Sequence, residues 1–139
     1  MAEINAKEPQ GVGGWLLVLS RLLIVWGPAN FGLAAMRALP ALPLRGWPLG
    51  AVLVARLLVT AFGIGAGMAL ASRRSSAVRL AQTALLLSAA MDLVGYTTPY
   101  FPNNRMPGDT PLHVAASLTY HGGWLMYLHR SRRVRNTYE

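Results

Sequence analysis

The sequence predicts an all-α protein, an integral membrane four-helix bundle with both termini in the cytoplasm. Hydrophobic residues make up 53% of the 139 residues and charged residues only 13%, about half of the charged share of a soluble domain. The apolar residues gather in four runs, and each run is close to the roughly 20 residues that a helix needs to cross a bilayer. A soluble fold of this size could not hide them.

The four runs are expected to form the spans of a single transmembrane domain. They cover residues 14–36, 49–71, 79–98 and 111–128, and the first contains Arg21 and Pro28. Helices are predicted because backbone hydrogen bonds must close within each segment where water is absent. The runs lack the alternation of a barrel strand. Residues 1–12 are expected to be an N-terminal tail, and residues 130–139 a basic cytoplasmic tail.

The connections between the runs contain residues that end helices. Segments 39–48 and 98–111 are rich in Pro, Gly and Asn, and segment 72–79 is short and basic. The two Glu and one Lys before the first run do not make the basic start of a cleavable signal. We therefore expect the first run to remain as a membrane anchor.

Positive charges favour one side of this arrangement. Three of them, Arg37, Arg45 and Arg105, fall on the outer side of alternating crossings. Eight fall on the side of the termini: Lys7, Arg73, Arg74, Arg79, Arg130, Arg132, Arg133 and Arg135. The positive-inside bias then predicts cytoplasmic termini.

Two short motifs resemble an uncharacterised family of small bacterial membrane proteins. One is Gly-Gly-Trp-Leu near the start, and the other is Ser-x-Arg-Val-x-x-Thr with an aromatic residue near the end. Their residues here are Gly13, Gly14, Trp15 and Leu16, then Ser131, Arg133, Val134, Thr137 and Tyr138. The resemblance covers the ends of the chain and implies the membrane fold and a bacterial inner membrane, but no activity.

Arg56 and Asp92 are charged residues within predicted spans. At about 1.5 Å per residue they lie about 12 Å and about 10 Å from the outer ends of their helices. We expect a buried ion pair, with Asn30 and Ser117 close enough to share hydrogen bonds. A structural clamp is favoured over a proton or ion relay, because a relay needs titratable groups reaching both surfaces and the third run offers only Gln82 on the cytoplasmic side.

His121 falls near the predicted centre of the bilayer. A neutral imidazole there could ligate a haem iron or a chlorophyll magnesium, but a second histidine for bis-His haem is missing from the first three runs. The favoured alternative is a hydrogen bond from His121 to another helix, using Tyr120 or nearby backbone carbonyls. No cofactor and no metal site are expected, and the chain has no cysteine.

Small and basic residues suggest packing and surface contacts. Gly63 and Gly67 have the spacing of close helix packing, with Gly122 and Gly123 expected opposite them. Arg21 is expected to extend to lipid headgroups, or to bind a lipid phosphate or a partner. Anionic lipid is likewise favoured over a protein partner for Arg73, Arg74, Arg130, Arg132, Arg133 and Arg135.

The chain offers no nucleophile with a base, carboxylate pair or metal cage, so an enzyme is the least expected class. The favoured function is an accessory subunit that packs against a larger membrane complex, such as a respiratory or photosynthetic assembly. Its expected docking loops carry Trp47, Tyr100, Phe101 and Met106. A small transporter or channel using Arg56 and Asp92, and a pigment- or haem-binding protein using His121, remain alternatives. Nucleic acid and soluble substrates are not expected, because the positive charges lie between apolar runs.

Overall fold

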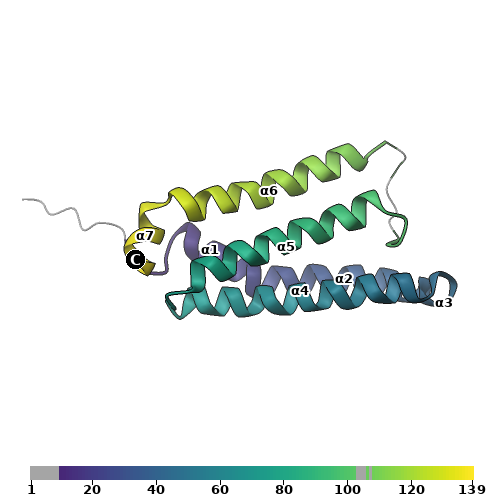
Figure 1. The fold of residues 1–139 in the computed structure, drawn as a ribbon, viewed down its shortest axis with the longest axis horizontal. Coiled ribbons are helices and arrows are strands. Elements are labelled where there is room, and N and C mark those ends of the chain that lie inside the picture. Colours follow the sequence, from purple (N-terminus) through teal and green to yellow (C-terminus); the bar gives the residue numbers. More distant parts are fainter. Residues whose placement is uncertain (1–9, 103–105, 107) are drawn as a thin grey trace, which may run out of the picture.

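The computed structural model describes residues 10–102, 106 and 108–139, and every regular element in this part of the chain is helical (Figure 1). Three helical segments are long and apolar enough to cross a membrane: Trp15–Arg45, Trp47–Ala71 and Ala77–Thr97. In the most apolar 18 residues of each, only 17%, 17% and 22% of residues are buried within the protein. Helices that expose apolar residues to this extent are typical of lipid-facing spans. The predicted all-helical membrane fold is confirmed for these three segments.

Helix α6 (Thr110–Arg130) accounts for the fourth predicted run. It packs along α5 (Ala77–Thr97) and is long enough to cross a bilayer, but it is less apolar than the other three segments. His113, Ser117 and His121 lower its apolarity, and all three face the interior of the bundle. The helix is therefore present, whereas its crossing of the membrane stays a prediction.

The first segment is longer and less regular than predicted. It consists of α1 (Trp15–Arg21), the π-helical turn η1 (Leu22–Trp26), α2 (Gly27–Ala38), the 3-10 turn η2 (Leu39–Ala41) and α3 (Leu42–Arg45). Pro28 does not end the helix. It follows a widened turn in which the N–H of Gly27 bonds the carbonyl of Leu22, five residues earlier.

The prediction of a loop from residue 39 was wrong for residues 39–45. Pro40 and Pro43 each lie in the first turn of a short helix, where the missing proline N–H costs no hydrogen bond. The segment ends at Gly46, whose φ of 67° is the left-handed conformation that glycine adopts without strain. Pro48 then occupies the first turn of α4 (Trp47–Ala71).

Helix α4 lies at the centre of the packing and contacts α1, η1, α2, α3 and α5. Its glycines explain part of this closeness. A Cβ on Gly67 would lie 2.8 Å from Cγ1 of Ile24 and 3.1 Å from the backbone oxygen of Ser20. The predicted packing role of Gly63 and Gly67 is confirmed, because both are buried against the first segment.

Gly122 and Gly123 do not pack opposite these glycines, so that prediction was wrong. Both are exposed, and a Cβ on either would meet no atom within 4 Å. The reason is the orientation of α6, which turns Ser117, His121 and Leu128 inward. Its glycines consequently lie on the outer face.

The C-terminal tail is folded rather than extended. Residues Arg132–Tyr138 form α7, which packs on α5 and α6. Thr137 Oγ1 accepts a hydrogen bond from the N–H of Gly11 at 2.9 Å, and the Tyr138 hydroxyl donates to the carbonyl of Leu70 at 2.6 Å. The two motifs of the family resemblance thus meet at one end of the bundle, where Leu16 and Val134 belong to the same apolar cluster.

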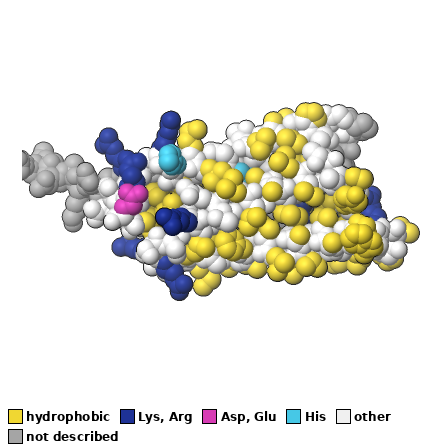
Figure 2. All heavy atoms as spheres, viewed as in Figure 1, with side chains coloured by type: hydrophobic (Ala, Val, Ile, Leu, Met, Phe, Trp, Pro, Cys, Tyr) yellow, Lys and Arg dark blue, Asp and Glu magenta, His cyan; other side chains and the backbone are white. Residues whose placement is uncertain are grey.

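The two ends of the bundle have separate apolar cores. The cluster at the α7 end contains Leu16, Leu19, Leu70, Leu85 and Leu128, and the cluster at the other end contains Ala38, Leu49, Leu53 and Phe101. On the face shown in Figure 2, exposed positive side chains gather around the α7 end, and between the ends many apolar side chains lie on the surface without a charged side chain among most of them. Lys7 and Arg105, which enter the predicted charge bias, lie outside the described residues.

Candidate functional site

An ion pair joins two of the long helices between the apolar cores. Arg56 of α4 places Nη2 3.2 Å from Oδ1 of Asp92 on α5. The two side chains are 17% and 21% exposed. Because an unpaired charge inside a bilayer is costly, each residue provides the counter-charge that the other needs. The ion pair expected from the matching depths of the two residues is present.

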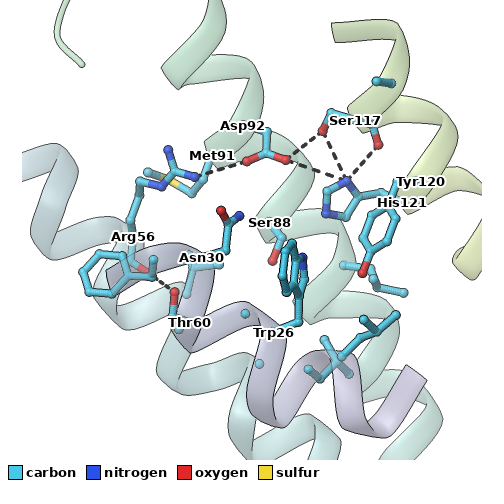
Figure 3. Close-up of a pocket in the computed structure, with 18 of the residues that line it drawn as sticks. Trp26, Asn30, Arg56, Thr60, Ser88, Met91, Asp92, Ser117, Tyr120 and His121 are labelled. Carbon is cyan, nitrogen blue, oxygen red and sulfur yellow. Dashed lines mark hydrogen bonds and ion pairs between the residues drawn. The ribbon is translucent and has the colours of Figure 1, made fainter. Parts of the chain in front are cut away.

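Two residues of α6 extend the pair into a chain of polar contacts (Figure 3). Ser117 donates its hydroxyl hydrogen to Oδ2 of Asp92 at 2.8 Å. His121 Nδ1 lies 2.9 Å from the backbone oxygen of Ser117, 3.3 Å from its hydroxyl oxygen and 4.0 Å from Oδ2 of Asp92. The spacing of four residues places Ser117 and His121 on one face of α6, where both are buried. Arg56, Asp92, Ser117 and His121 are called the polar cluster below.

Phe101 covers the polar cluster at the end opposite α7. Its ring lies 5.1 Å from the guanidinium carbon of Arg56, in cation–π geometry. Arg45 holds the preceding turn, because its Nη1 donates to the carbonyl of Pro99 at 2.5 Å. Phe101 is buried, so its predicted role in a docking loop was wrong. The aromatic ring packs on Leu49 and Leu53 instead of facing outward.

A cavity of about 250 Å³ adjoins the polar cluster and is bordered by all four long helical segments. All four residues of the polar cluster lie in its wall. Its other polar or aromatic lining residues are Trp26, Asn30, Phe31, Thr60, Ser88, Tyr96, His113 and Tyr120. The ring of His113 lies against that of Tyr96 at 5.6 Å between centroids.

The cavity is partly open on the side of η1 and α6. Trp26 and Tyr120 line it from these two elements and are 55% and 40% exposed. α2 packs mainly on α4, and α6 mainly on α5. Toward the α7 end, Trp15 meets Trp124 edge to face at 6.4 Å, which joins α1 to α6. The opening therefore lies on the side surface of the bundle, between η1 and α6, rather than at the α7 end.

The other candidate residues make no hydrogen bond or ion pair with the polar cluster among the described residues. Asn30 lines the cavity, but among the described residues its side chain has no hydrogen-bond partner, so its predicted bond with the ion pair was wrong. The cavity lies between α2, which carries Asn30, and the polar cluster. Trp47, Tyr100 and Met106 are exposed, and Arg21 is exposed at the end of α1.

Sequence reasoning missed several residues that line the cavity, among them Ser88, Trp26 and Tyr96. A usable signal was present for Ser88, which lies four residues before Asp92 and so one turn along the same face of α5. Trp26 lines the opening of the cavity from the π-helical turn Leu22–Trp26, whose extra residue rotates the side chains relative to those of a regular α-helix. Composition gives no sign of that turn.

The arrangement can bind and orient a small molecule. It offers donors on Arg56, acceptors on Asp92 and a histidine ring within one partly enclosed space. Within the described ranges, no group of three or more His, Asp or Glu side chains could hold a metal ion. No protein family, curated protein or solved structure matches the chain significantly.

Proposed function

We propose that this chain is a non-catalytic integral membrane protein that binds one small molecule in the cavity between its helices. One observation carries the proposal: the polar cluster, contributed by three helices, lies in the wall of a partly open cavity of about 250 Å³. Ionisable residues inside a membrane span mark functional sites by default. A concave space with a few convergent polar groups is the usual form of a ligand site.

The space itself favours binding over a purely structural clamp. A clamp needs the contacts among Arg56, Asp92 and Ser117, but it needs no cavity beside them, and protein interiors are otherwise filled to high density. A transport function is supported less well. Apolar side chains, including Leu16, Leu70 and Leu128, fill the bundle at the α7 end, so a polar path toward that side is not continuous among the described residues.

We further propose that the chain crosses a bacterial inner membrane four times with both termini in the cytoplasm. The hydrogen bond between Gly11 and Thr137 supports an even number of crossings, because it holds the two terminal segments at one end. The 21 residues of α6 span about 31 Å, which is enough for a bilayer. His113, Ser117 and His121 line the cavity, which keeps these polar side chains of α6 away from lipid.

Topology can be tested with single cysteines, because the chain contains none. Ser75→Cys lies in the turn before α5, and Gly108→Cys lies just before α6. In intact spheroplasts a membrane-impermeant maleimide is expected to label Gly108→Cys and to label Ser75→Cys only after lysis. Labelling of both positions from outside would contradict the four crossings.

Binding can be tested by filling the cavity. Ser88→Phe places a ring into the cavity, and Ala90→Phe places the same ring on the exposed face of the same helix. Mass spectrometry of organic extracts from the purified proteins is expected to find a compound enriched with the wild type and Ala90→Phe but lost from Ser88→Phe. No difference between the wild type and Ser88→Phe would contradict the binding function.

An accessory role in a larger complex is a second proposal, supported by apolar side chains at the end opposite α7. Leu44 is 90% exposed, Trp47 81% and Met36 73%. Exposed apolar side chains grouped in this way are typical of interaction surfaces. Mild extraction followed by native electrophoresis and mass spectrometry is expected to find a partner. Migration as a bare 15.0 kDa species would contradict this role.

A further inference from the structure

We infer that the cavity takes the uncharged, hydroxylated ring of an amphipathic molecule, and that Nε2 of His121 accepts a hydrogen bond from its hydroxyl. This inference rests on the proposed binding function and names the class of ligand. Three features of the structure carry it: the hydrogen-bonding state of His121, the charge balance of the cavity wall, and an apolar hollow that adjoins the cavity.

The partners of His121 fix which ring nitrogen carries the proton. Nδ1 lies 2.9 Å from the backbone oxygen of Ser117, and a carbonyl oxygen can only accept. The Ser117 hydroxyl, 3.3 Å away, gives its hydrogen to Asp92 and so also acts toward Nδ1 as an acceptor. Nδ1 must therefore be the donor. In the neutral imidazole this leaves Nε2 with a free lone pair.

His121 is buried, and its Nε2 has no hydrogen-bond partner in the part of the chain that the structure describes. His121 is 7% exposed and lines the cavity, and Figure 3 shows its ring directed from α6 into the space between the helices. A buried acceptor without a donor is costly. A ligand hydroxyl would remove this cost, so the ring is prepared to receive a hydrogen bond from a bound molecule.

The charges in the cavity wall favour an uncharged ligand. Arg56 and Asp92 are the only lining residues with a formal charge among those described, apart from the histidines, and they neutralise each other. A charged head would bring an unbalanced charge into a site of low dielectric, which is costly. The exposed rings of Trp26 and Tyr120 at the opening favour a flat ring, because aromatic groups pack well against each other.

A second hollow explains where the apolar tail of such a molecule would lie. It is an open groove of about 410 Å³ on the surface of the first segment, and Leu22 and Trp26 line both this groove and the cavity. Its other lining residues are Leu17, Val18, Arg21, Val25 and Ala29, all but one of them apolar. The polar cavity and the apolar hollow together match a molecule with a hydroxylated ring at one end and a hydrocarbon chain at the other.

The test compares two probes that differ in the donor hydrogen. Para-nonylphenol has a ring hydroxyl, and in para-nonylanisole a methyl group replaces the hydroxyl hydrogen. Binding of the tritiated probes to the protein in lipid nanodiscs is measured with empty nanodiscs subtracted. The wild type is expected to bind the phenol about tenfold more tightly, the effect of one well-formed buried hydrogen bond.

Three variants assign that preference to His121. His121→Phe is expected to bring the ratio of the two dissociation constants close to one. His121→Gln should keep most of the preference, because its amide oxygen can stand near the position of Nε2 and accept. His129→Phe, at the exposed end of α6, should match the wild type. Dividing the ratio of each variant by the ratio of the wild type cancels any difference in how the two probes partition into lipid.

Four results would overturn the inference. These are equal binding of the two probes by the wild type, no binding of either, an undiminished preference in His121→Phe, and a visible absorption band in the purified wild type that is lost in His121→Gln. The last result would assign Nε2 to a haem iron or a chlorophyll magnesium. The cavity-filling experiment keeps the two proposals apart. If one of these four results were obtained and a compound were still lost from Ser88→Phe, the ligand class would be wrong and the binding function would be retained.

Discussion

Ser117 on α6 donates its hydroxyl hydrogen to Asp92 on α5 at 2.8 Å, across 25 positions of sequence. The second oxygen of the same carboxylate accepts from Arg56 on α4. One carboxylate therefore connects three helices around the cavity. Loss of its charge affects both contacts at once.

Asp92→Asn is expected to destabilise the bundle by about 2 kcal/mol, because Arg56 keeps its charge without a counter-charge. Breaking a fully buried pair costs roughly 3–5 kcal/mol, and this pair is partly exposed to the cavity. Unfolding in nanodiscs or mixed micelles measures the change. Adding Arg56→Gln to Asp92→Asn should recover part of the loss, because the remaining amides are uncharged.

Asp109→Asn serves as the matched control for the same chemical change. Asp109 precedes α6 outside the polar cluster, and its side chain makes no capping hydrogen bond. Its substitution should leave stability within about 0.5 kcal/mol of the wild type. If Asp92→Asn had a normal yield and stability but selectively lost ion transport, the ion pair would be part of a proton or ion relay and not a structural clamp.

Ser117→Ala is expected to cost about 1 kcal/mol, the usual value of one hydrogen bond. The proton of His121 should nevertheless stay on Nδ1, because the backbone oxygen of residue 117 remains as its acceptor. Nitrogen-15 spectra of histidine-labelled protein distinguish the two tautomers. Thr119→Ala, which removes an exposed hydroxyl bonded only within α6, is the control. A shift of the proton to Nε2 in Ser117→Ala would show that the hydroxyl sets the tautomer.

The ion pair could be predicted from sequence because two strong rules act together. A charge within a span must find a partner, and the rise of a helix converts residue number into depth. Arg56 and Asp92 follow both rules and meet, and Ser117, at a similar depth on α6, donates to the same carboxylate. Asn30 lies at a similar depth, but it is uncharged and therefore needs no counter-charge. Depth along the helix also does not give the distance between two helices.

The positions of Phe101 and the C-terminal segment could not be predicted in this way. Phe101 follows a helix end in a Pro-rich segment, and its inward turn depends on the bond from Arg45 to the carbonyl of Pro99. Helix α7 carries basic residues that suggest a solvated tail. Val134 and Tyr138, on its inner face, pack against the bundle, and these contacts exist only in the folded protein.

Gly67→Ala is expected to destabilise the protein by about 1–3 kcal/mol, because the added methyl group would overpack the contact with the first segment. Its Cβ would lie 2.8 Å from Cγ1 of Ile24 and 3.0 Å from Cβ of Leu23. Gly65→Ala is the matched control in the same helix. No atom lies within 4 Å of its Cβ position, so alanine should raise stability by a few tenths of a kcal/mol or more through helix propensity. Equal effects of the two substitutions on thermal unfolding would contradict close packing at Gly67.

Docking of α7 is expected to weaken as the pH rises above about 10. Burial raises the pKa of Tyr138 above its usual value of 10.0, and the nearby positive charge of Arg73 lowers it only in part. When α7 is released, the exposed Tyr138 ionises at its usual pKa, so release is accompanied by loss of a proton and becomes easier at higher pH. The stabilisation that neutral Tyr138 gives to docking should thus be fully present below pH 10 and be lost as the pH passes through the raised pKa, as measured by hydrogen exchange or proteolysis of residues 132–138. Tyr138→Phe lacks the hydrogen bond to the carbonyl of Leu70, so α7 should be released more readily at neutral pH and should show no alkaline step. Tyr100→Phe, at an exposed position, is the control and should behave as the wild type. An alkaline step that persists in Tyr138→Phe would assign it to another group.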